Sequence, residues 1–452
     1  MKTHRSVSRR EFLKNAGRAG AALAAFNIVP SRVLGQFAPS NRVNVAMIGA
    51  GNQSSIDTKA FLAEPDTQIV AICDVNRASA GYKTEEQFLG REPVRQMVEQ
   101  YYAAQQPSGK YRGCDGYTDF REVIARPDVD AVAIVVPDHW HAIMTVMAAQ
   151  AGNDIYCEKP LSLTVADGQA MVNAVRRYGV VLQTGTHHRS EPRTRHFCEL
   201  VRNGRIGKLK RIVAYVPPWN KSCPPGAWEP TPVPDGSDYE MWLGPAPWAP
   251  YHKDRCFYNF RFILDYSGGQ VTNFGAHCLD LAQWANGTEL TGPVEVEDAG
   301  SEWPTDGLFD VASKVHFRAR YADGVELECA QSEGRPACRF EGTEGWLMSG
   351  YQGSGFDSNI PGLQASVIGP QEISLGTSDN HFRNFLDCIK TRRDPIAPVE
   401  VGHRSATLCH IGNIAMRLKR KLRWDPVAEK FIGDDQANQM LSRPYREPWH
   451  LS

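Results

Sequence analysis

A lysine at the end of a short apolar segment has the residue type and position for chemistry. The stretch 153–160 reads NDIYCEKP, in which a predicted strand at 154–157 ends in Glu158, Lys159 and Pro160. Proline restricts the backbone after the lysine, and a lysine leaving a strand is held more rigidly than one on a helix surface. The same pair could form an ordinary surface ion pair, so the neighbouring elements decide between the two interpretations.

A glycine turn near residue 50 could hold a dinucleotide. The predicted strand at 43–48 runs into Gly49-Ala50-Gly51-Asn52, and a helix is expected to follow and to end near residue 63. Gly49 permits a tight turn, and Gly51 lets the backbone approach a pyrophosphate at the helix N-terminus. Ser54 stands where the fingerprint has its third glycine, so the turn alone is weak support.

An acid follows at the distance that the dinucleotide fold requires. The predicted strand at 68–74 ends in Asp74, 23 residues beyond Gly51. A carboxylate here could bind the ribose 2′-hydroxyl and would repel a 2′-phosphate, which predicts NAD as the cofactor. Arg77 could weaken this preference, so NADP remains possible.

Alternating helices and strands must position these residues. After a polar insertion at 77–116, in which the sequence shows no chemistry, strands are expected at 131–136, 154–157 and 180–185, with helices at 120–126, 141–151 and 165–178. Nearly all-apolar strands in βα units predict a doubly wound parallel sheet, an α/β Rossmann domain at 36–188. From 189 to 452, longer strands, hairpin turns and helices near 380–391 and 402–420 predict an α+β domain with a largely antiparallel sheet.

Two further segments carry polar side chains that could reach the same site. The turn Val136-Pro137-Asp138-His139-Trp140-His141 leaves the sheet at its carboxyl edge, where open α/β sheets bind ligands. Its two histidines lack a third ligand, so no metal is expected and Pro137 and His141 are candidates for cofactor contacts. In the second half, Asn273 and His277 share one face of a predicted helix. A lone histidine there is more often a packing or capping residue.

The first 35 residues predict export. Ser8-Arg9-Arg10-Glu11-Phe12-Leu13-Lys14 precedes an Ala-rich apolar run at 16–29, which indicates a twin-arginine signal at 1–35 and a periplasmic or otherwise exported protein. No later stretch has the length of a membrane span. The net charge of −1 gives no bulk attraction to nucleic acid. The 11 cysteines are odd in number and lack CxxC spacing, so most are expected to be reduced core residues.

Taken together, these motifs resemble the Gfo/Idh/MocA oxidoreductases, relatives of glucose–fructose oxidoreductase and inositol dehydrogenase, and within them an exported, twin-arginine branch. The resemblance runs from about Val43 to the C-terminal segment. It implies that Lys159 contacts the substrate hydroxyl and the nicotinamide, and that His277 serves acid–base catalysis. The family's aspartate four residues before the histidine is Asn273 here, which removes a carboxylate from the site. The expected cofactor contacts are Gly49, Gly51, Asn52, Asp74, Pro137, His141, Glu158 and Lys159.

We therefore expect hydride transfer between NAD and a hydroxyl-bearing carbon of a sugar or cyclitol, with a tightly bound cofactor that is recycled in place. Arg189, Tyr258 and Arg261 are candidates for substrate contacts, although ordinary packing explains them as well. The alternatives are an NAD-dependent, redox-neutral glycosidase and a non-catalytic sugar-binding protein that retains the fold. The partners expected are a small sugar or glycoside and a second copy of the chain, with no nucleic acid and no stable membrane span.

Overall fold

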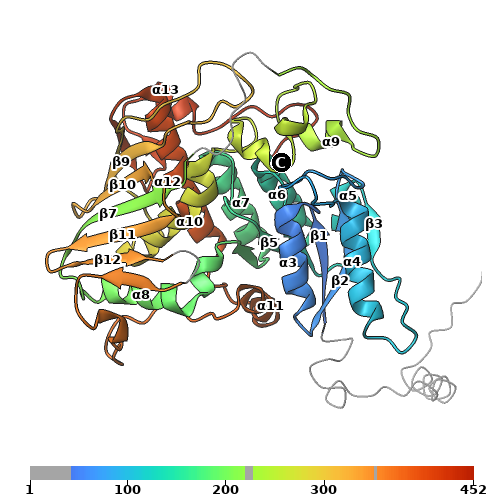
Figure 1. The fold of residues 1–452 in the computed structure, drawn as a ribbon, viewed down its shortest axis with the longest axis horizontal. Helices are drawn as coiled ribbons and strands as arrows, with labels where there is room; N and C mark the ends of the chain where they lie inside the picture. Colours follow the sequence, from blue (N-terminus) through green and yellow to red (C-terminus); the bar gives the residue numbers. More distant parts are fainter. Residues whose placement is uncertain (1–41, 219–227, 351–353, 452) are drawn as a thin grey trace, which may run out of the picture. The chain divides into compact units, whose positions relative to one another are not determined.

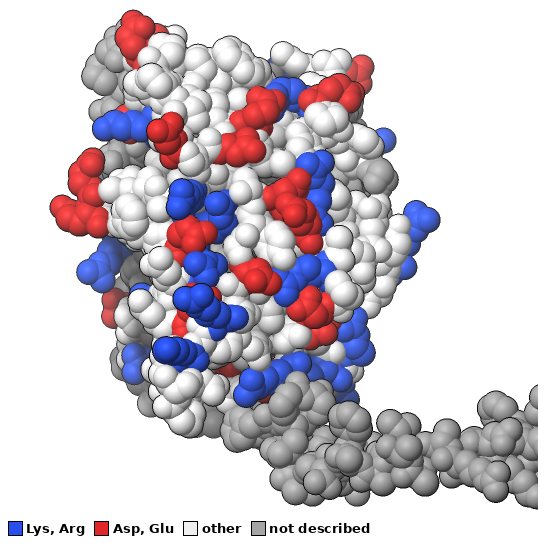
Figure 2. Space-filling model, turned by 90° about the vertical axis from the view of Figure 1, so that its right-hand side faces the viewer, with Lys and Arg blue, Asp and Glu red and all other residues white. Residues whose placement is uncertain are grey.

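The computed structural model describes residues 42–218, 228–350 and 354–451. The predicted signal at 1–35 lies outside these residues. Within them, no helix combines the length and apolarity needed to cross a membrane. The face on the right of Figure 1, where α4 (Arg91–Ala103) and β3 (Asp115–Tyr117) lie, carries interspersed positive and negative side chains, as Figure 2 shows.

A six-stranded parallel sheet forms the N-terminal layer, as predicted. Its order is β3-β2-β1-β4-β5-β6, so the chain reverses direction across the sheet between β1 and β4. Ile48 pairs with both Cys73 and Ile134, and Ile134 pairs with Cys157, so four strands end level with one another. Residues that follow these ends therefore meet at one edge, at the switch point where such sheets bind ligands. Besides β3, the strands are β1 (Val43–Ile48), β2 (Thr67–Cys73), β4 (Ala131–Ile134), β5 (Asp154–Cys157) and β6 (Leu182–Thr184).

Helices cover both faces of this sheet, which explains why its strands are apolar on both sides. One face packs against α5 (Phe120–Ile124), α6 (His141–Ala151) and α7 (Val165–Tyr178). The other packs against α3 (Asn52–Leu62), α4 and, from the far end of the chain, α11 (His381–Thr391). Phe385 of α11 lies 6.4 Å from Phe61 of α3, ring centre to ring centre. The C-terminal part of the chain thus completes the core of the N-terminal domain.

The second domain is built on a nine-stranded, largely antiparallel sheet, also as predicted. Its order is β13-β12-β11-β7-β10-β9-β8-β14-β15. Among the described strands of this sheet, only β7 and β10 pair in parallel. The strands are β7 (Leu209–Val216), β8 (Glu295–Asp298), β9 (His316–Arg320), β10 (Glu326–Gln331), β11 (Ala337–Gly342), β12 (Trp346–Ser349), β13 (Phe356–Ser358), β14 (Leu422–Asp425) and β15 (Lys430–Phe431).

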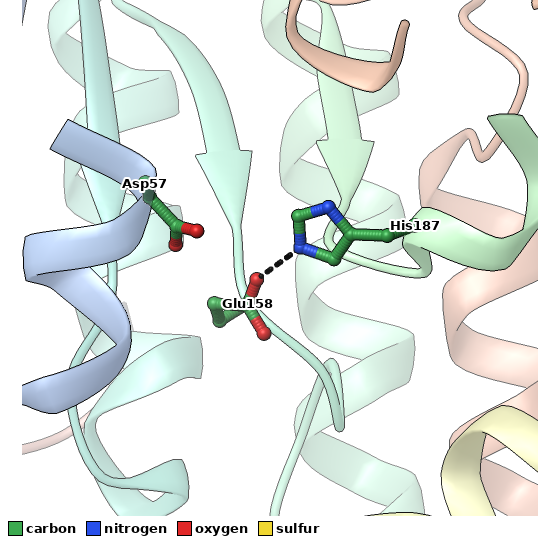
Figure 3. Close-up of side chains that lie close together, drawn as sticks. All are labelled: Asp57, Glu158 and His187. Atoms are coloured by element: carbon green, nitrogen blue, oxygen red, sulfur yellow. Dashed lines mark hydrogen bonds and ion pairs between the residues drawn. The ribbon is translucent and has the colours of Figure 1, made fainter. Parts of the chain in front are cut away.

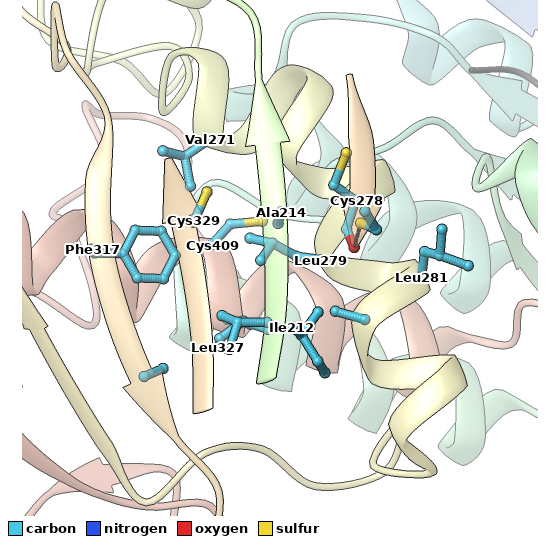
Figure 4. Close-up of a cluster of buried hydrophobic side chains, with 14 of the residues drawn as sticks. Ile212, Ala214, Val271, Cys278, Leu279, Leu281, Phe317, Leu327, Cys329 and Cys409 are labelled. Atoms are coloured by element: carbon cyan, nitrogen blue, oxygen red, sulfur yellow. Dashed lines mark hydrogen bonds between the residues drawn. The ribbon is translucent and has the colours of Figure 1, made fainter. Parts of the chain in front are cut away.

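One face of this sheet packs on α8 (Pro192–Arg202), α10 (Gln270–Asn286) and α12 (Val399–Leu418). Strand β9 shows the alternation, because Phe317 and Ala319 are buried whereas Arg318 and Arg320 are exposed. Burying one such phenylalanine contributes about 1.5–3 kcal/mol. Figure 4 shows the core between α10 and the sheet. The short helix α13 (Asp435–Gln439) adds Ala437 to the core of this domain, whereas α9 (Tyr239–Leu243) adds Leu243 to a separate apolar cluster.

The cysteines behave as the sequence predicts. The ten that the structure describes are free and buried. Cys278, Cys329 and Cys409 lie in the apolar cluster of Figure 4, where each fills the volume of a small hydrophobic side chain.

Candidate active site

A cavity of about 580 Å³ opens where the first sheet meets α10. The cavity is lined by Gly49, Asp74, Pro137 and Lys159, which follow the ends of four parallel strands, and by Asn273 of α10. Its volume lies within the range of small-molecule sites. The level strand ends thus bring together residues that are up to 224 positions apart in the sequence.

The turn from β1 to α3 forms one end of the cavity. Gly49 has φ +98°, and a side-chain Cβ there would lie 2.1 Å from the carbonyl oxygen of Val135. Helix α3 begins at Asn52 with Gly51 as its N-cap and no side chain capping it, so its first N–H groups are free to bind an anion. Ser54, in place of the third glycine, donates a hydrogen bond to the Gly49 carbonyl at 2.5 Å and fits the turn.

Asp74 holds this turn in place. Its carboxylate accepts hydrogen bonds from the backbone N–H groups of Ala50 at 2.5 Å and Asn76 at 2.7 Å. Burial raises its pKa to about 6, against these two hydrogen bonds. Asp74 lines the cavity, whereas Arg77 does not. The Arg77 side chain is therefore not placed to bind a 2′-phosphate, which agrees with NAD as the cofactor. The glycine that a Cβ would exclude, the uncapped helix start and the acid together fit a dinucleotide.

The polar insertion contributes to the site, contrary to our expectation that it carries no chemistry. Tyr82 lies over the glycine turn, with its ring 3.1 Å from the position of a Cβ at Gly51. It also packs against Phe257 of the second domain at 4.6 Å between ring centres. Gln87 donates a hydrogen bond to Asn52 Oδ1 at 2.8 Å. The segment 77–90 therefore covers the cofactor turn and links it to the second domain.

Lys159 and Asn273 meet across the cavity. The lysine Nζ lies 3.3 Å from the carbonyl oxygen and 3.4 Å from Oδ1 of Asn273. Gly269 is the N-cap of the helix that carries the asparagine. It has φ +73°, and a Cβ there would lie 2.9 Å from Val311, so this position requires glycine. Burial lowers the pKa of Lys159, and the positive charge of Arg261 lowers it further, whereas Glu158 opposes the shift.

His277 lies one helical turn beyond Asn273 and also lines the cavity. Its Nδ1 is buried and has no hydrogen-bond partner among the described residues. Its ring lies 4.7 Å from that of His188. Burial, followed by the charges of His188 and Lys159, holds the pKa of His277 well below its usual range. The ring is therefore neutral near pH 7 and able to accept a proton.

Three ionisable side chains, Asp57, Glu158 and His187, lie close together, as Figure 3 shows, and Glu158 directly precedes Lys159 in the sequence. His187 Nε2 lies 3.0 Å from Glu158 Oε1, and although burial opposes both charges, this contact raises the pKa of His187 and lowers that of Glu158. Asp57 points at the pair from α3 and accepts a hydrogen bond from Gln53 at 2.9 Å. Burial, then the charge of Glu158, raises the pKa of Asp57 to about 8.

The same three side chains each offer one ligand atom, and these atoms lie within 4.8 Å of one another. A divalent ion could bind all three if the side chains moved slightly closer together. Glu158 and His187 already satisfy each other, and the Lys159 ammonium disfavours a second cation. A proton on Asp57 removes the negative charge of this carboxyl group beside Glu158, so the observed geometry needs no metal to balance it. The prediction that the protein has no metal remains untested.

His141 is not among the residues that line the cavity, and its assignment to cofactor binding stays a prediction. Its Nδ1 lies 2.8 Å from the carbonyl oxygen of Pro160, and its Nε2 lies 3.0 Å from that of Val136. Although burial opposes the charge, Cys157 and then Asp138 raise the pKa of His141 to about 10, and the Pro160 carbonyl adds to this effect. The ring links the turn after β4 to the turn after Lys159 and so helps to fix the position of the lysine.

Of the three predicted substrate residues, the structure brings Tyr258 and Arg261 into the cavity but not Arg189. Arg189 is buried and donates two hydrogen bonds of 2.8 Å to the carboxylate of Asp280. Its guanidinium is therefore committed to holding the helix α10 in place. The Arg261 guanidinium stacks on the Tyr258 ring at 3.8 Å, and both come from the turn at 258–262.

Comparison with known proteins extends over both domains. The model of an oxidoreductase family with an NAD-binding Rossmann fold, GFO/IDH/MocA, matches residues 43–186. The model of the C-terminal alpha/beta domain of that family matches residues 221–451. The N-terminal domain is thus an NAD-binding Rossmann domain, and NAD is the cofactor that its turn and acid accept.

Individual relatives cover less of the chain. A 1,5-anhydro-D-fructose reductase from Ensifer adhaerens is 36% identical over 121 residues, 26% of this chain and 35% of that protein. Glycosyl hydrolase family 109 protein 1 from Shewanella sp. (strain ANA-3) is 27% identical over 223 residues, 45% of this chain and 44% of that protein. The chain spans about a quarter to a third of the length of the first curated relatives it matches.

Solved structures share the fold over a longer span. Levoglucosan dehydrogenase in complex with NADH and levoglucosan matches with a TM-score of 0.58 and 19% identity, over 84% of this chain and 99% of that chain. The resemblance inferred from the glycine turn, the Glu-Lys-Pro segment and the helix of His277 is confirmed by the two family models. This chain belongs to the GFO/IDH/MocA family of oxidoreductases.

Proposed function

We propose that the protein is an NAD-dependent oxidoreductase that acts at a hydroxyl-bearing carbon of a sugar or cyclitol. One observation carries the proposal: Lys159 meets Asn273, one turn before His277, in the cavity that the dinucleotide turn also lines. Bound NAD supplies the acceptor for the hydride, a chemistry that no protein side chain provides. The side chains have to bind the hydroxyl, orient it and move its proton.

Lys159 and His277 divide these tasks. The Lys159 ammonium donates to the substrate oxygen and stabilises the negative charge that develops on it. His277, neutral because burial depresses its pKa, accepts the hydroxyl proton. Asn273 orients the lysine through Oδ1 but, as an amide, leaves the positive charge of Lys159 unbalanced.

Export adds a further element to the proposal. The twin-arginine pattern at 1–35 supports transport of the folded protein with NAD already bound. Outside the cytoplasm a free nicotinamide pool is not at hand, so the cofactor has to be regenerated on the protein. A pair of sugars, one oxidised and one reduced, meets this requirement.

A redox-neutral glycosidase is the second candidate, and the glycosyl hydrolase family 109 relative favours it, because that match covers 45% of the chain. In this cycle oxidation of a glycoside precedes loss of the aglycone, addition of water and reduction, without net change of the cofactor. The same Lys159 and His277 would serve both reductions and oxidations.

Two assays with purified protein test these proposals. Bound nicotinamide is identified after denaturation, and sugars and aryl glycosides are then screened for a change in nicotinamide absorbance and for aglycone release. Lys159→Ala should abolish both, whereas Lys253→Ala, at an exposed lysine outside the cavity, should not. Full turnover of Lys159→Ala on every accepted substrate would contradict the assignment. Protein that neither contains nor binds NAD would instead indicate a sugar-binding protein that retains the fold.

A further inference from the structure

Three cationic side chains of the cavity form no ion pair with its carboxylates. Lys83, Lys159 and Arg261 line it, and within the described residues none of the three has a carboxylate within the 4.0 Å of an ion pair. Unpaired cations in a partly dry site are costly, and they are retained where a ligand supplies the anion.

Every acid of the cavity is engaged elsewhere. Asp74 accepts two backbone N–H groups, and Asp138 accepts the hydroxyl of Ser267 at 2.5 Å. Glu158 pairs with His187, Glu191 accepts the hydroxyl of Thr194, and Asp57 accepts the amide of Gln53. Asp138 acts on Lys159 and Arg261 only from beyond ion-pair distance, so a direct anionic partner for these cations would come from a bound molecule.

Two of the three cations lie against the same ring. The centre of the Tyr258 ring lies 3.8 Å from the Arg261 guanidinium and 5.8 Å from Lys83 Nζ. Arg261 is also joined to the helix of Asn273 and His277, because its carbonyl oxygen accepts the N–H of Gly269 at the start of α10. Its charge is also close enough to Lys159 to lower the pKa of that lysine, after the larger effect of burial.

Arg261 is held ready to bind a planar anion. Tyr258 stacks on its guanidinium at 3.8 Å and fixes the plane of the group. Its Nε is shielded from solvent and has no hydrogen-bond partner among the described residues. A fixed guanidinium with free donors fits a carboxylate or a phosphate through two parallel hydrogen bonds.

We propose that Arg261 binds an anionic group of the substrate and that the substrate is consequently a sugar acid or a sugar phosphate instead of a neutral sugar. This inference rests on the proposed oxidation of a sugar hydroxyl at Lys159. The anionic group would lie on the side of Lys159 that faces the turn at 258–262, and the carbinol carbon would lie between Lys159 and His277.

Calorimetric binding to the NAD-loaded protein tests the inference without relying on turnover. The probes are three acids, D-glucuronate, D-galacturonate and D-gluconate, their uncharged amides, and D-glucose 6-phosphate against D-glucose. We expect at least one anion to bind about 10- to 100-fold more tightly than its neutral counterpart, the range of a charge-assisted hydrogen-bond pair. Whether an acid or the phosphate shows the preference identifies the anionic group.

Variants connect the preference to one side chain. Arg261→Gln should abolish it, Arg261→Lys should retain part of it through charge alone, and Lys253→Gln, which removes an exposed charge eight residues away, should leave it unchanged. NAD content and melting temperature, measured on each variant, confirm folding. Equal affinity of the wild type for all acids and their amides would overturn the inference, as would weaker NAD binding by Arg261→Gln with an unchanged preference.

The outcomes separate this inference from the proposed function. Oxidation of neutral sugars with no preference for anions would leave the proposed function standing and refute the role of Arg261. An Arg261-dependent preference for anions, with no sugar changing the nicotinamide absorbance, would support the anion site and refute the oxidation.

Discussion

Replacing Asn273 by aspartate restores a carboxylate that the family motif contains and tests the electrostatic account of Lys159. The new charge would lie where Oδ1 now lies, 3.4 Å from the lysine Nζ. Two unit charges at about 4 Å interact by about 4 kcal/mol at an effective dielectric constant near 20. Desolvation of the new carboxylate offsets part of this, so we expect the pKa of Lys159 to rise by about 1–3 units.

The pH dependence of kcat/KM for sugar oxidation measures this shift. Deprotonation of Lys159 ends activity on the alkaline side, so Asn273→Asp should move that limb upward by about 1–3 pH units. The acid limb should move in the same direction, because the carboxylate lies one turn before His277 and favours its protonated form. Asn273→Ala, which removes the amide without adding a charge, is the control and should not raise the alkaline limb. An unchanged alkaline limb in Asn273→Asp would refute the reasoning.

Three further substitutions test other parts of the structure. Asp57 has a folded pKa of about 8, above its unfolded value, so the stability of the wild type should fall as pH rises from about 4 to about 8. Calorimetry should show a smaller fall in Asp57→Asn. The same dependence of stability on pH in the wild type and the variant would contradict the burial of a protonated acid. Arg189→Met leaves Asp280 buried without its partner and should lower the free energy of urea unfolding by about 3–5 kcal/mol; a smaller loss with a raised KM would return Arg189 to the substrate site. Gly49→Ala places a Cβ 2.1 Å from a carbonyl oxygen and should reduce the NAD that copurifies, whereas wild-type NAD content would argue against the dinucleotide turn.

The parts of the site that follow from local sequence could be predicted. Gly49 and Asp74 stand directly after an apolar strand and Lys159 stands two residues after one, and parallel strands place such positions at one edge of a sheet. The helix of Asn273 and His277 follows from its 3.6-residue period. The two sheets could be predicted for the same reason, because apolar runs in βα units and alternating hairpin strands are local patterns.

The parts that depend on distant contacts could not be predicted. Arg189 reads as a free cation until the fold brings Asp280, 91 residues away, into contact with it. Tyr82 lies in a polar segment with no period, and its burial involves a distant contact with Phe257 of the second domain. Its aromatic side chain does not single it out, because the same insertion also contains Phe88, which is exposed. Asp57 is one polar residue in a polar helix, and nothing in its neighbours indicates burial.

The most direct test of the account follows an isotope from sugar to cofactor. Purified protein is mixed with sugars that carry deuterium at their hydroxyl-bearing carbons, and the cofactor released by denaturation is weighed by mass spectrometry. The account predicts deuterium in the bound nicotinamide for at least one sugar, and none in Lys159→Ala that has the same NAD content. Unlabelled cofactor with every sugar, in wild-type protein that contains NAD and binds sugar, would contradict oxidation at Lys159.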